Sequence, residues 1–345
     1  MVTAIGGIGV GEQIVKALRI AGGYRIIGAD VNPEVPQSLL VDEFDTLPRA
    51  NDPRYLDELL RIARQYSASA IFYGSEAELR VMSEESERIR DAGFFLPLNP
   101  AEVIEAGMDK MATMRFLESN GFSTPRSTTI TDLDAALEID YFPAVVKPVY
   151  ESGGSRDVHI VQSADELRLL IQLMPAKTLM IQEYVGRPDA EYTVGVLHDM
   201  DGRFVNSIAL HRRLDGLLNI RHSTPNRTKR QELGSELVIS SGVSHGFVDR
   251  FPQVTKTCER IAASLGVFGP VNIQCRLVGN EVYVFEINPR FSGTTSIRAM
   301  FGYNEPDVLI RRHLLGEDVE TRFPYGKGLV LRSLTETLVP GGQDH

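Results

Sequence analysis

The sequence predicts two architectures in succession, a parallel α/β part followed by an antiparallel α+β part. In residues 1 to about 98, apolar strands alternate with amphipathic helices, which is typical of βαβ units around a parallel sheet. From Phe142 onward, strands follow one another with few helices between them, which indicates antiparallel pairing. A chain of 345 residues is long enough for two or three such packed units.

Each element of the first part is bounded by a change of hydrophobic period or by a turn residue. The expected strands and helices, in chain order, are Val2–Ile5, about Gly11–Ala21, Arg25–Ala29, about Tyr55–Tyr66, Ala70–Tyr73 and Ala77–Asp91. The helical pattern breaks at Leu98–Pro100 and again at Thr124-Pro125. Between the breaks, Ala112–Asn120 forms a short helix that Gly121 ends, so we expect a hinge region between domains.

The second part contains seven expected strands and two longer helices. The strands are Ala144–Lys147, Val158–Val161, Thr178–Tyr184, Glu191–His198, Phe204–Leu210, Val271–Leu277 and Val282–Ile287. The helices are Asp165–Leu173 and Pro252–Leu265. Gly279-Asn280 separates the last two strands and predicts a hairpin. A final helical part follows Thr294.

Charge and cysteine content restrict the classes of partner. A net charge of −10 would repel nucleic acids and anionic membranes, so we expect a small-molecule substrate and neither of those partners. Cys258 and Cys275 lack metal-ligand spacing, and two cysteines are no disulfide framework. The first residues carry neither the basic flank nor the long apolar stretch of a signal peptide or membrane span. We expect a cytoplasmic protein and leave a homodimer open.

Gly6–Gly11 form a glycine-rich turn between the first strand and the first helix. Backbone N–H groups there could approach a phosphate, and Asp30 follows the second strand, where a ribose-binding acid can lie. The spacing departs from G-x-G-x-x-G, because Glu12 occupies the third glycine position and would bring negative charge to a pyrophosphate. Because of this departure, we prefer to interpret the segment as a tight turn that packs the helix. An NAD-dependent oxidoreductase that uses the turn is kept as an alternative function.

A second glycine-rich segment follows a strand that ends in a lysine. Pro143–Pro148 holds Lys147 at the strand end. The small residues that follow it are Ser152, Gly153, Gly154 and Ser155. Such residues let the backbone close over polyphosphate oxygens while the lysine supplies a point charge. Taken alone, a solvated lysine before a turn explains the pattern equally well.

Two later segments carry polar side chains within otherwise apolar strands, Gly269–Gln274 and Phe285–Arg290. Glu286 and Asn288 are two residues apart and project from one face, and Gln274 can lie at the same level on the neighbouring strand. One carboxylate and two carboxamides suit Mg²⁺ and neutralise it only in part, which leaves charge to offset phosphates. The alternative is an exposed polar hairpin edge, but burying such groups is costly unless they are used.

These motifs resemble those of ATP-grasp ligases, with the pattern of the carbamoyl-phosphate synthase large subunit and its stand-alone relatives. Gly-Pro-x-Asn-x-Gln and Glu-x-Asn-Pro-Arg carry the resemblance, which covers nearly the whole chain. It implies a pre-ATP-grasp α/β domain at 1–98, hinge helices and a lid at 99–185, and a central antiparallel domain with the metal site and C-terminal helices at 186–345. It also implies ATP and Mg²⁺ as cofactors, with Mn²⁺ as a substitute.

The resemblance implies roles for individual residues. The metal ligands would be Gln274, Glu286 and Asn288, and the catalytic residues Arg290 and Asn272. The nucleotide would contact Lys110, Lys147, Ser152, Gly153, Gly154, Ser155, Glu183, Tyr184, Val185 and Glu191. In this set the lysines face the phosphates, the backbone of residues 183–185 meets the adenine edge, and the last carboxylate takes the ribose hydroxyls.

The expected function is that of an ADP-forming carboxylate–amine ligase that acts through an acyl phosphate on small-molecule acid and amine substrates. Carbamoyl-phosphate synthases carry a Gly-His-Thr-Gly segment where this chain has Ser240–Gly246, and this chain has one grasp unit rather than two. Bicarbonate and carbamate are therefore not the expected substrates. A thiol nucleophile is an alternative, as is a non-catalytic ATP sensor. A sensor would not need Lys147, Glu286 and Arg290 together.

Basic residues concentrate between His211 and Arg230, although the whole chain is acidic. They are Arg212, Arg213, Arg221, Arg227, Lys229 and Arg230, against a single acid, Asp215. A solvated loop is one explanation. The other is that the segment reaches the mouth of the phosphate site, where an arginine binds a substrate carboxylate or the transferred phosphoryl group. Arg213 is our choice for a catalytic role because it lies just past a strand end.

Overall fold

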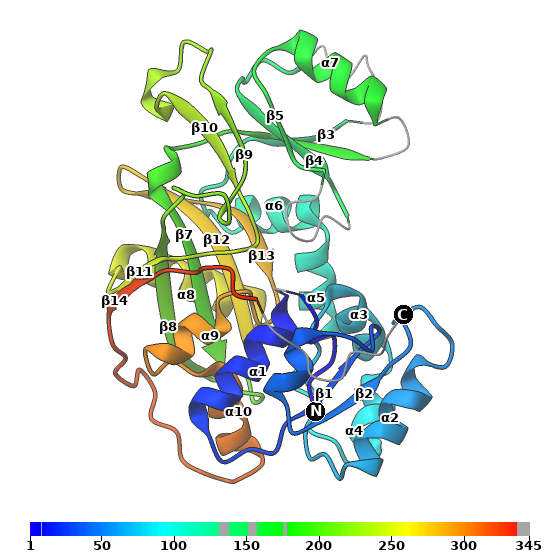
Figure 1. The fold of residues 1–345 in the computed structure, drawn as a ribbon. Helices are drawn as coiled ribbons and strands as arrows, with labels where there is room; N and C mark the ends of the chain where they lie inside the picture. Colours follow the sequence, from blue (N-terminus) through cyan, green and yellow to red (C-terminus); the bar gives the residue numbers. More distant parts are fainter. Residues whose placement is uncertain (8, 131–137, 151–156, 175–177, 337–345) are drawn as a thin grey trace.

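The structure is a computed structural model that describes residues 1–7, 9–130, 138–150, 157–174 and 178–336. A large sheet occupies the middle of the molecule, with the N-terminal elements and a small sheet at opposite ends (Figure 1). Within those ranges, no helix is both long and apolar enough to cross a membrane.

The N-terminal elements form a parallel sheet covered by helices. β1 (Ile27–Asp30) pairs in parallel with β2 (Glu43–Thr46), and Val2 bridges in parallel to the chain at Gly28 and Phe72. The helices are α1 (Val10–Ala21), η1 (Pro36–Leu40), α2 (Tyr55–Gln65), α3 (Glu76–Glu84) and α4 (Ser86–Asp91). The predicted parallel arrangement is confirmed. The prediction of one helix over residues 77–91 is wrong, because Glu85 leaves helical geometry and separates α3 from α4.

The glycine turn before α1 is a site of close packing. A Cβ atom on Gly11 would lie 2.4 Å from the carbonyl oxygen of Ala4, so a larger residue would push the helix away from the strand. Asp30 accepts a hydrogen bond from the Gly6 N–H at 2.7 Å and another from the Asn32 N–H at 3.0 Å. The carboxylate considered for a ribose contact instead holds the turn, which favours the packing role of this segment.

Two helices connect the N-terminal elements to the small sheet. They are α5 (Ala101–Met108), which was not expected from the sequence, and α6 (Lys110–Ser119). Asp109 caps α6 by accepting hydrogen bonds from the backbone N–H groups of Met111 and Ala112 at 2.8 and 2.9 Å. Gly121, with φ of 72°, follows the end of α6 as predicted. Because α6 contacts β13, the cap brings Lys110 close to the large sheet.

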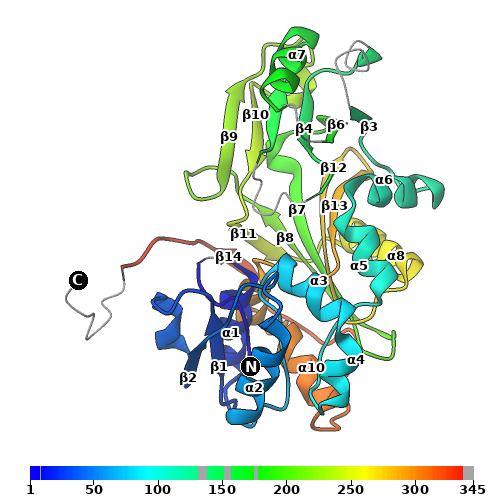
Figure 2. The same cartoon turned by 90° about the vertical axis from the view of Figure 1, so that its right-hand side faces the viewer.

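The small sheet has four antiparallel strands in the order β3-β6-β4-β5. They are β3 (Ser127–Ile130), β4 (Ala144–Pro148), β5 (His159–Val161) and β6 (Leu179–Glu183). α7 (Ala164–Leu173) packs against them through Leu167 and Ile171. Figure 2 shows the small sheet and α7 at one end of the molecule, above the large sheet.

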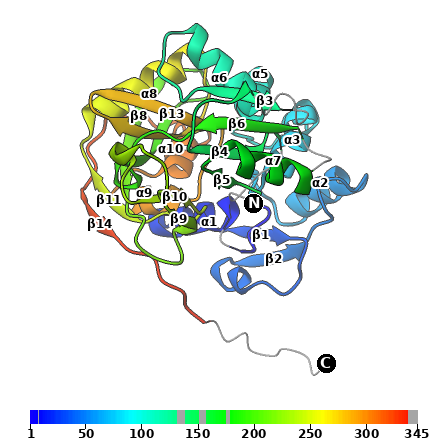
Figure 3. The same cartoon turned by 90° about the horizontal axis from the view of Figure 1, so that it is seen from above.

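The large sheet has six antiparallel strands in the order β13-β12-β7-β8-β11-β14. They are β7 (Glu191–His198), β8 (Phe204–Arg212), β11 (Gly246–Asp249), β12 (Pro270–Val278), β13 (Glu281–Asn288) and β14 (Gly328–Val330). α8 (Pro252–Leu265) packs on the sheet through Val254 and Ile261. α9 (Thr295–Met300) and α10 (Glu305–His313) pack against α1. Seen from above, α8 and the N-terminal strands lie on opposite sides of the molecule (Figure 3).

A further hairpin forms where the sequence analysis expected a loop. β9 (Ile220–Pro225) pairs antiparallel with β10 (Glu236–Ser240). Leu233 and Leu237 pack with Tyr184 at the end of the small sheet. The loop prediction is wrong because β9 has almost no apolar face of its own, and its pairing depends on contacts with distant segments.

Candidate functional site

Polar residues form a row on one face of the large sheet. Gln274 on β12 lies opposite Glu286 on β13 and Thr193 on β7. Asn272, two residues earlier, lies opposite Asn288. Alternate residues of a strand share a face, so these side chains belong to the same side of the sheet. The prediction that Gln274 and Glu286 lie at the same level is confirmed.

Hydrogen bonds connect this polar row to the N-terminal elements. The amide of Gln274 donates to Glu286 Oε2 at 2.6 Å. Arg290 Nη2 donates to Asn288 Oδ1 at 3.1 Å and to Glu76 Oε1 on α3 at 2.6 Å. The charge of Arg290 lowers the pKa of Glu76, although burial opposes the shift. Glu76 was not among the residues expected at the site; the signal for it in the sequence is its position just after the Ala70–Tyr73 strand of a parallel sheet.

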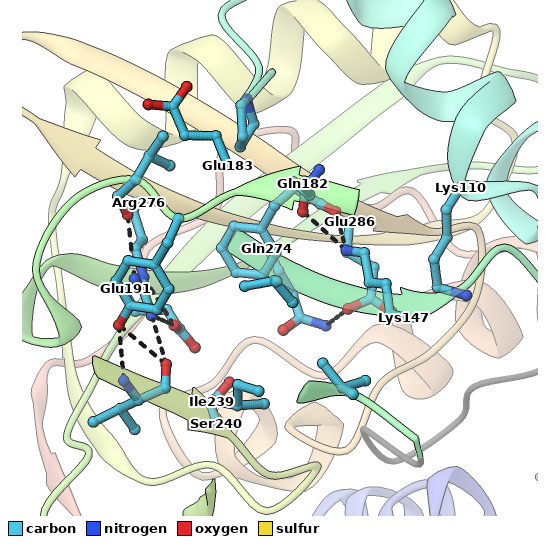
Figure 4. A pocket seen from close by; sticks show the side chains of 17 residues that line it. Lys110, Lys147, Gln182, Glu183, Glu191, Ile239, Ser240, Gln274, Arg276 and Glu286 are labelled. Atoms are coloured by element: carbon cyan, nitrogen blue, oxygen red, sulfur yellow. Dashed lines mark hydrogen bonds and ion pairs between the residues drawn. The ribbon is translucent and has the colours of Figure 1, made fainter. Parts of the chain in front are cut away.

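Lys147 lies at the end of β4 and is buried between the two sheets (Figure 4). Its Nζ donates to Gln182 Oε1 at 2.9 Å and to the carbonyl oxygen of Phe285 at 3.3 Å. Burial lowers the pKa of Lys147 to about 8, with Glu286 opposing and Lys110 adding to the shift. Two lysine side chains thus lie near the single carboxylate of the polar row. Gln182, which orients Lys147, was also missed.

Glu191 is a buried carboxylate held between two arginines. Its Oε1 accepts from Arg212 Nη1 at 3.0 Å, and its Oε2 accepts from Arg276 Nη2 and Nε at 2.9 and 3.1 Å. Burial alone would raise the pKa of Glu191, but Arg212 and Arg276 together lower it. Both oxygens of Glu191 thus already accept hydrogen bonds from the protein, while the residue also lines a cavity between the two sheets, so its contact with ribose stays a prediction.

Three cavities meet at the polar row. The first lies between the two sheets, the second between the N-terminal elements and β13, and the third over the polar face of the large sheet. Glu286 lines all three. Lys110 is shared by the first and second cavities, and Gln274 by the first and third. The residues shared by the second and third cavities are Glu76, Asn288 and Arg290.

The three cavities differ in their walls. The apolar residues of the first are Pro125, Val145, Val158, Val185, Val238, Ile239 and Phe285. The second has a volume of about 770 Å³, and Arg49 and Arg80 of the N-terminal elements contribute to it. The third is about 100 Å³. Its hydroxyl-bearing residues are Thr193, Ser241, Ser244, Ser292 and Thr294.

The structure brings most of the predicted residues to these cavities. Those that line at least one are Lys110, Lys147, Glu183, Tyr184, Val185, Glu191, Asn272, Gln274, Glu286, Asn288 and Arg290. The carboxylate of Glu183 is engaged elsewhere, because it pairs with Arg126 at 3.0 Å and with Arg230 at 2.8 Å. Ser152, Gly153, Gly154 and Ser155 lie outside the described residues.

The structure does not bring Arg213 to the polar row. Arg213 follows β8, has a side chain that is 41 % exposed, pairs with Asp215 and lines none of the three cavities. Arg212, the last residue of β8, is buried and lines the third cavity. Successive side chains of a strand point to opposite faces, so a shift of one residue decides which arginine reaches the site. Arg212, and not Arg213, is therefore the arginine of this segment that lies at the third cavity.

Two family models match the chain. "PylC-like, N-terminal domain" matches residues 3–96, and "ATP-grasp in the biosynthetic pathway with Ter operon" matches residues 175–337. The carbamoyl phosphate synthase large chain of Streptomyces avermitilis is 26% identical over 284 residues, and that of Micrococcus luteus is 28% identical over 291 residues. These matches cover 79% and 81% of this chain but 24% of each relative, so the chain spans about a quarter of their length.

Solved structures share the fold at low sequence identity. N5-carboxyaminoimidazole ribonucleotide synthetase from Thermus thermophilus has a TM-score of 0.66 and 18% identity, over 93% of this chain and 80% of that chain. L-amino acid ligase from Bacillus licheniformis has a TM-score of 0.60 and 18% identity, over 87% and 70%. The predicted parallel part followed by an ATP-grasp fold is confirmed. Because the family models, the relatives and the fold agree with the motifs on β12 and β13, the chain belongs to the ATP-grasp superfamily, with the sequence pattern of carbamoyl phosphate synthase large chains.

Proposed function

We propose that this chain is an ATP-dependent, ADP-forming ligase that joins a carboxylate to an amine through an acyl phosphate. The observation that carries the proposal is the meeting of three cavities at Glu286. A ligase of this kind must hold a nucleotide, an acid and a nucleophile at one point, because most of its rate enhancement comes from positioning. Three cavities with shared walls meet that requirement.

The first cavity suits the nucleotide. Its apolar residues can flank a base, while Lys110 and Lys147 can face the phosphates. The backbone N–H groups of Glu183 and Tyr184 already donate to carbonyl oxygens. The N–H of Val185 has no hydrogen-bond partner in the part of the chain that the structure describes. We therefore assign the adenine contact to Val185 in particular.

The polar row has a donor set that fits Mg²⁺. Glu286 supplies a carboxylate, and Asn288 and Gln274 supply amide oxygens. Gln274 directs its nitrogen to Glu286, and a half-turn of its amide would present the oxygen instead. Among the described residues no group of three or more His, Cys, Asp or Glu side chains could hold a metal, so nucleotide phosphates and water would complete the coordination. Bound Mg²⁺ would offset charge on the phosphates.

The proposed reaction has two steps. An oxygen of the substrate carboxylate attacks the γ-phosphorus, the bond to the β,γ-bridging oxygen breaks, and ADP leaves. The amine then attacks the acyl carbon and loses a proton, and inorganic phosphate leaves. Arg290 lines both cavities outside the nucleotide cavity, so it can stabilise the phosphoryl group in the first step and the leaving phosphate in the second.

The second and third cavities differ in ways that favour different substrates. The third is small, carries hydroxyl groups and is lined by Arg212 and Arg290, which suits the carboxylate of a small acid. The second is larger, at about 770 Å³. Arg49 and Arg80 line it and have no ion pair among the residues that the structure describes. We assign the larger substrate to the second cavity and expect it to carry an additional anionic group.

A phosphate-release screen tests the proposal. Purified protein is incubated with MgATP and pairs of amino acids and small acids, and inorganic phosphate and ADP are measured. Hydroxylamine then replaces the amine, because it converts an acyl phosphate to a stable hydroxamate. We expect ADP and hydroxamate in equal amounts with one class of acid. ADP release that does not depend on any acid, or tight NAD binding without ATP use, would contradict the proposal.

A further inference from the structure

A buried ion pair contacts the side chain of Asn272. Arg298 on α9 has a relative exposure of 1% and donates from Nη1 to Glu305 Oε1 on α10 at 2.9 Å. Glu305 also accepts from Thr295 Oγ1 at 3.1 Å. The other guanidinium nitrogen of Arg298, Nη2, donates to Asn272 Oδ1 at 2.6 Å. Neither member of the pair lines any of the three cavities, so the proposed reaction leaves its role unexplained.

The large sheet leaves space for this guanidinium. Gly195 on β7 is the residue opposite Asn272. A Cβ atom on Gly195 would lie 2.4 Å from Arg298 Nη1 and 2.9 Å from Glu305 Oε1. Its backbone is not in the left-handed region, so conformational freedom does not require a glycine at this position. The glycine instead provides the volume in which the ion pair reaches Asn272.

The contacts of Asn272 define the orientation of its amide. Oδ1 accepts from Arg298 and, at 2.8 Å, from Thr193 Oγ1, so both lone pairs of the oxygen are used. A guanidinium can only donate, which excludes the reversed amide at this contact. Nδ2 then points away from Arg298. It has no hydrogen-bond partner among the residues that the structure describes, and Asn272 lines the third cavity together with Arg290.

We propose that Arg298 is a positioning residue that directs Nδ2 of Asn272 toward an oxyanion in the third cavity. The inference rests on the proposed function, in which a carboxylate and then a phosphoryl group occupy this cavity. With the amide correctly oriented, Nδ2 donates to an anionic oxygen beside Arg290. With the amide reversed, its carbonyl oxygen would face the anion and repel it. Asn272 is accordingly a hydrogen-bond donor in the site rather than a metal ligand.

The test observes the side-chain NH₂ signals of Asn272 by nuclear magnetic resonance. The full chain is labelled with ¹⁵N at asparagine, and the signals are assigned by their loss in Asn272→Ala. Inorganic phosphate and acetate are added separately, with and without MgADP. We expect phosphate, acetate or both to shift the signals, and the responding probe identifies the bound group as phosphoryl or carboxylate. No response of the Asn272 signals to either probe would overturn the inference.

Two variants separate positioning from a merely structural role. Arg298→Met should weaken binding of the responding anion about tenfold, the loss expected for one hydrogen bond to a charged group. Gly195→Ala should cause the same loss, because it displaces the guanidinium while keeping every polar partner. Arg298→Lys retains a donor toward Oδ1 and should recover part of the affinity. Anion affinity and signal response unchanged in the folded variants would overturn the positioning role.

Arg312→Met is the matched control. Arg312 forms a different ion pair, with Asp199 at 2.8 Å, and lines none of the three cavities. This variant should keep the response of Asn272, and an equal loss there would overturn the specific role of Arg298. Calorimetry measures MgADP binding separately. Absence of MgADP binding to the wild type would reject the proposed function. The response of the Asn272 signals to phosphate or acetate without MgADP would still decide whether Nδ2 faces the anion.

Discussion

The β12–β13 hairpin and the β9–β10 hairpin both line the first cavity, but they are stabilised in different ways. In β12–β13, apolar residues such as Ile273 and Val284 join the core cluster that packs on α8. In β9–β10, Leu237 packs with Tyr184, and an exposed ion pair at 2.8 Å joins Arg227 to Glu166 of α7. One wall of the cavity thus belongs to the large sheet, while the other is attached to the small sheet.

This difference concerns function as well as stability. The wall on the large sheet presents Gln274 and Glu286, whose positions follow from strand register. The wall on β10 presents Ile239 and Ser240, which depend on contacts between separate parts of the chain. We expect substitutions in the first wall to act mainly on chemistry. Substitutions around the second wall should change the stability of the fold and the affinity for the nucleotide. The change should be larger for buried residues than for exposed ones.

The largest effect is expected for Glu286→Ala. Glu286 is the only carboxylate of the proposed metal ligands, so its loss should lower ADP formation at least about a thousandfold, or roughly 4 kcal/mol of transition-state stabilisation. The melting temperature should change little. Glu281→Ala is the control, since Glu281 is an exposed acid of the same hairpin whose carboxylate accepts from Ser123 Oγ at 2.9 Å. Near wild-type turnover of Glu286→Ala at saturating Mg²⁺ would refute the metal assignment.

The next effect separates two neighbouring arginines. Arg212→Met leaves the buried carboxylate of Glu191 with one partner fewer, and should destabilise the fold by about 3 kcal/mol and lower turnover. Arg213→Ala removes only an exposed pair with Asp215 and should change both quantities by less than about 1 kcal/mol. Denaturant unfolding and steady-state ADP formation measure the two effects. The opposite ranking would restore Arg213 to the site.

A pH titration examines Lys147 on β4, which lines the first cavity. Its folded pKa of about 8 is below the ordinary value of 10.5, so between these values the unfolded chain binds more protons and stability rises with pH. Nucleotide affinity should move the other way, because the charged lysine attracts phosphates. We expect ADP affinity in EDTA to fall about tenfold from pH 7 to 9.5. Lys147→Arg, which stays charged, should give a flatter profile. Parallel profiles for both proteins would remove Lys147 from the phosphate site.

The smallest effect is expected on the outer side of β9–β10. Arg227 is 61% exposed and pairs with Glu166, so Arg227→Ala should change stability by less than about 0.5 kcal/mol. The Michaelis constant for the acid substrate should also stay within about twofold, because Arg227 lines none of the three cavities. Lys229→Ala is a second exposed substitution in the same segment. A large rise in that constant for either variant would bring the basic segment into the acid site.

Local pattern was sufficient for much of the fold and for the core of the candidate site. Apolar alternation predicted β12 and β13, and Gly279-Asn280 predicted the turn between them, so strand pattern alone placed Gln274 and Glu286 at one level. The order of the parallel and antiparallel parts followed from the spacing of strands and helices. The β9–β10 hairpin could not be predicted in this way, because β9 lacks an apolar face of its own and β10 buries its apolar residues only against distant segments such as Tyr184.

The sequence by itself determined which residues alternate along the strands of the β12–β13 hairpin, that Gly121 ends α6, and which motif places Glu286, Asn288 and Arg290 together. Those properties depend on neighbours a few residues away. Only the tertiary structure decided that Glu76 reaches Arg290 and that Arg298 reaches Asn272. It also decided that arginines from two other strands occupy both oxygens of Glu191. The physical reason is that these contacts join segments whose approach depends on how sheets and helices pack, which local hydrophobic periodicity does not encode.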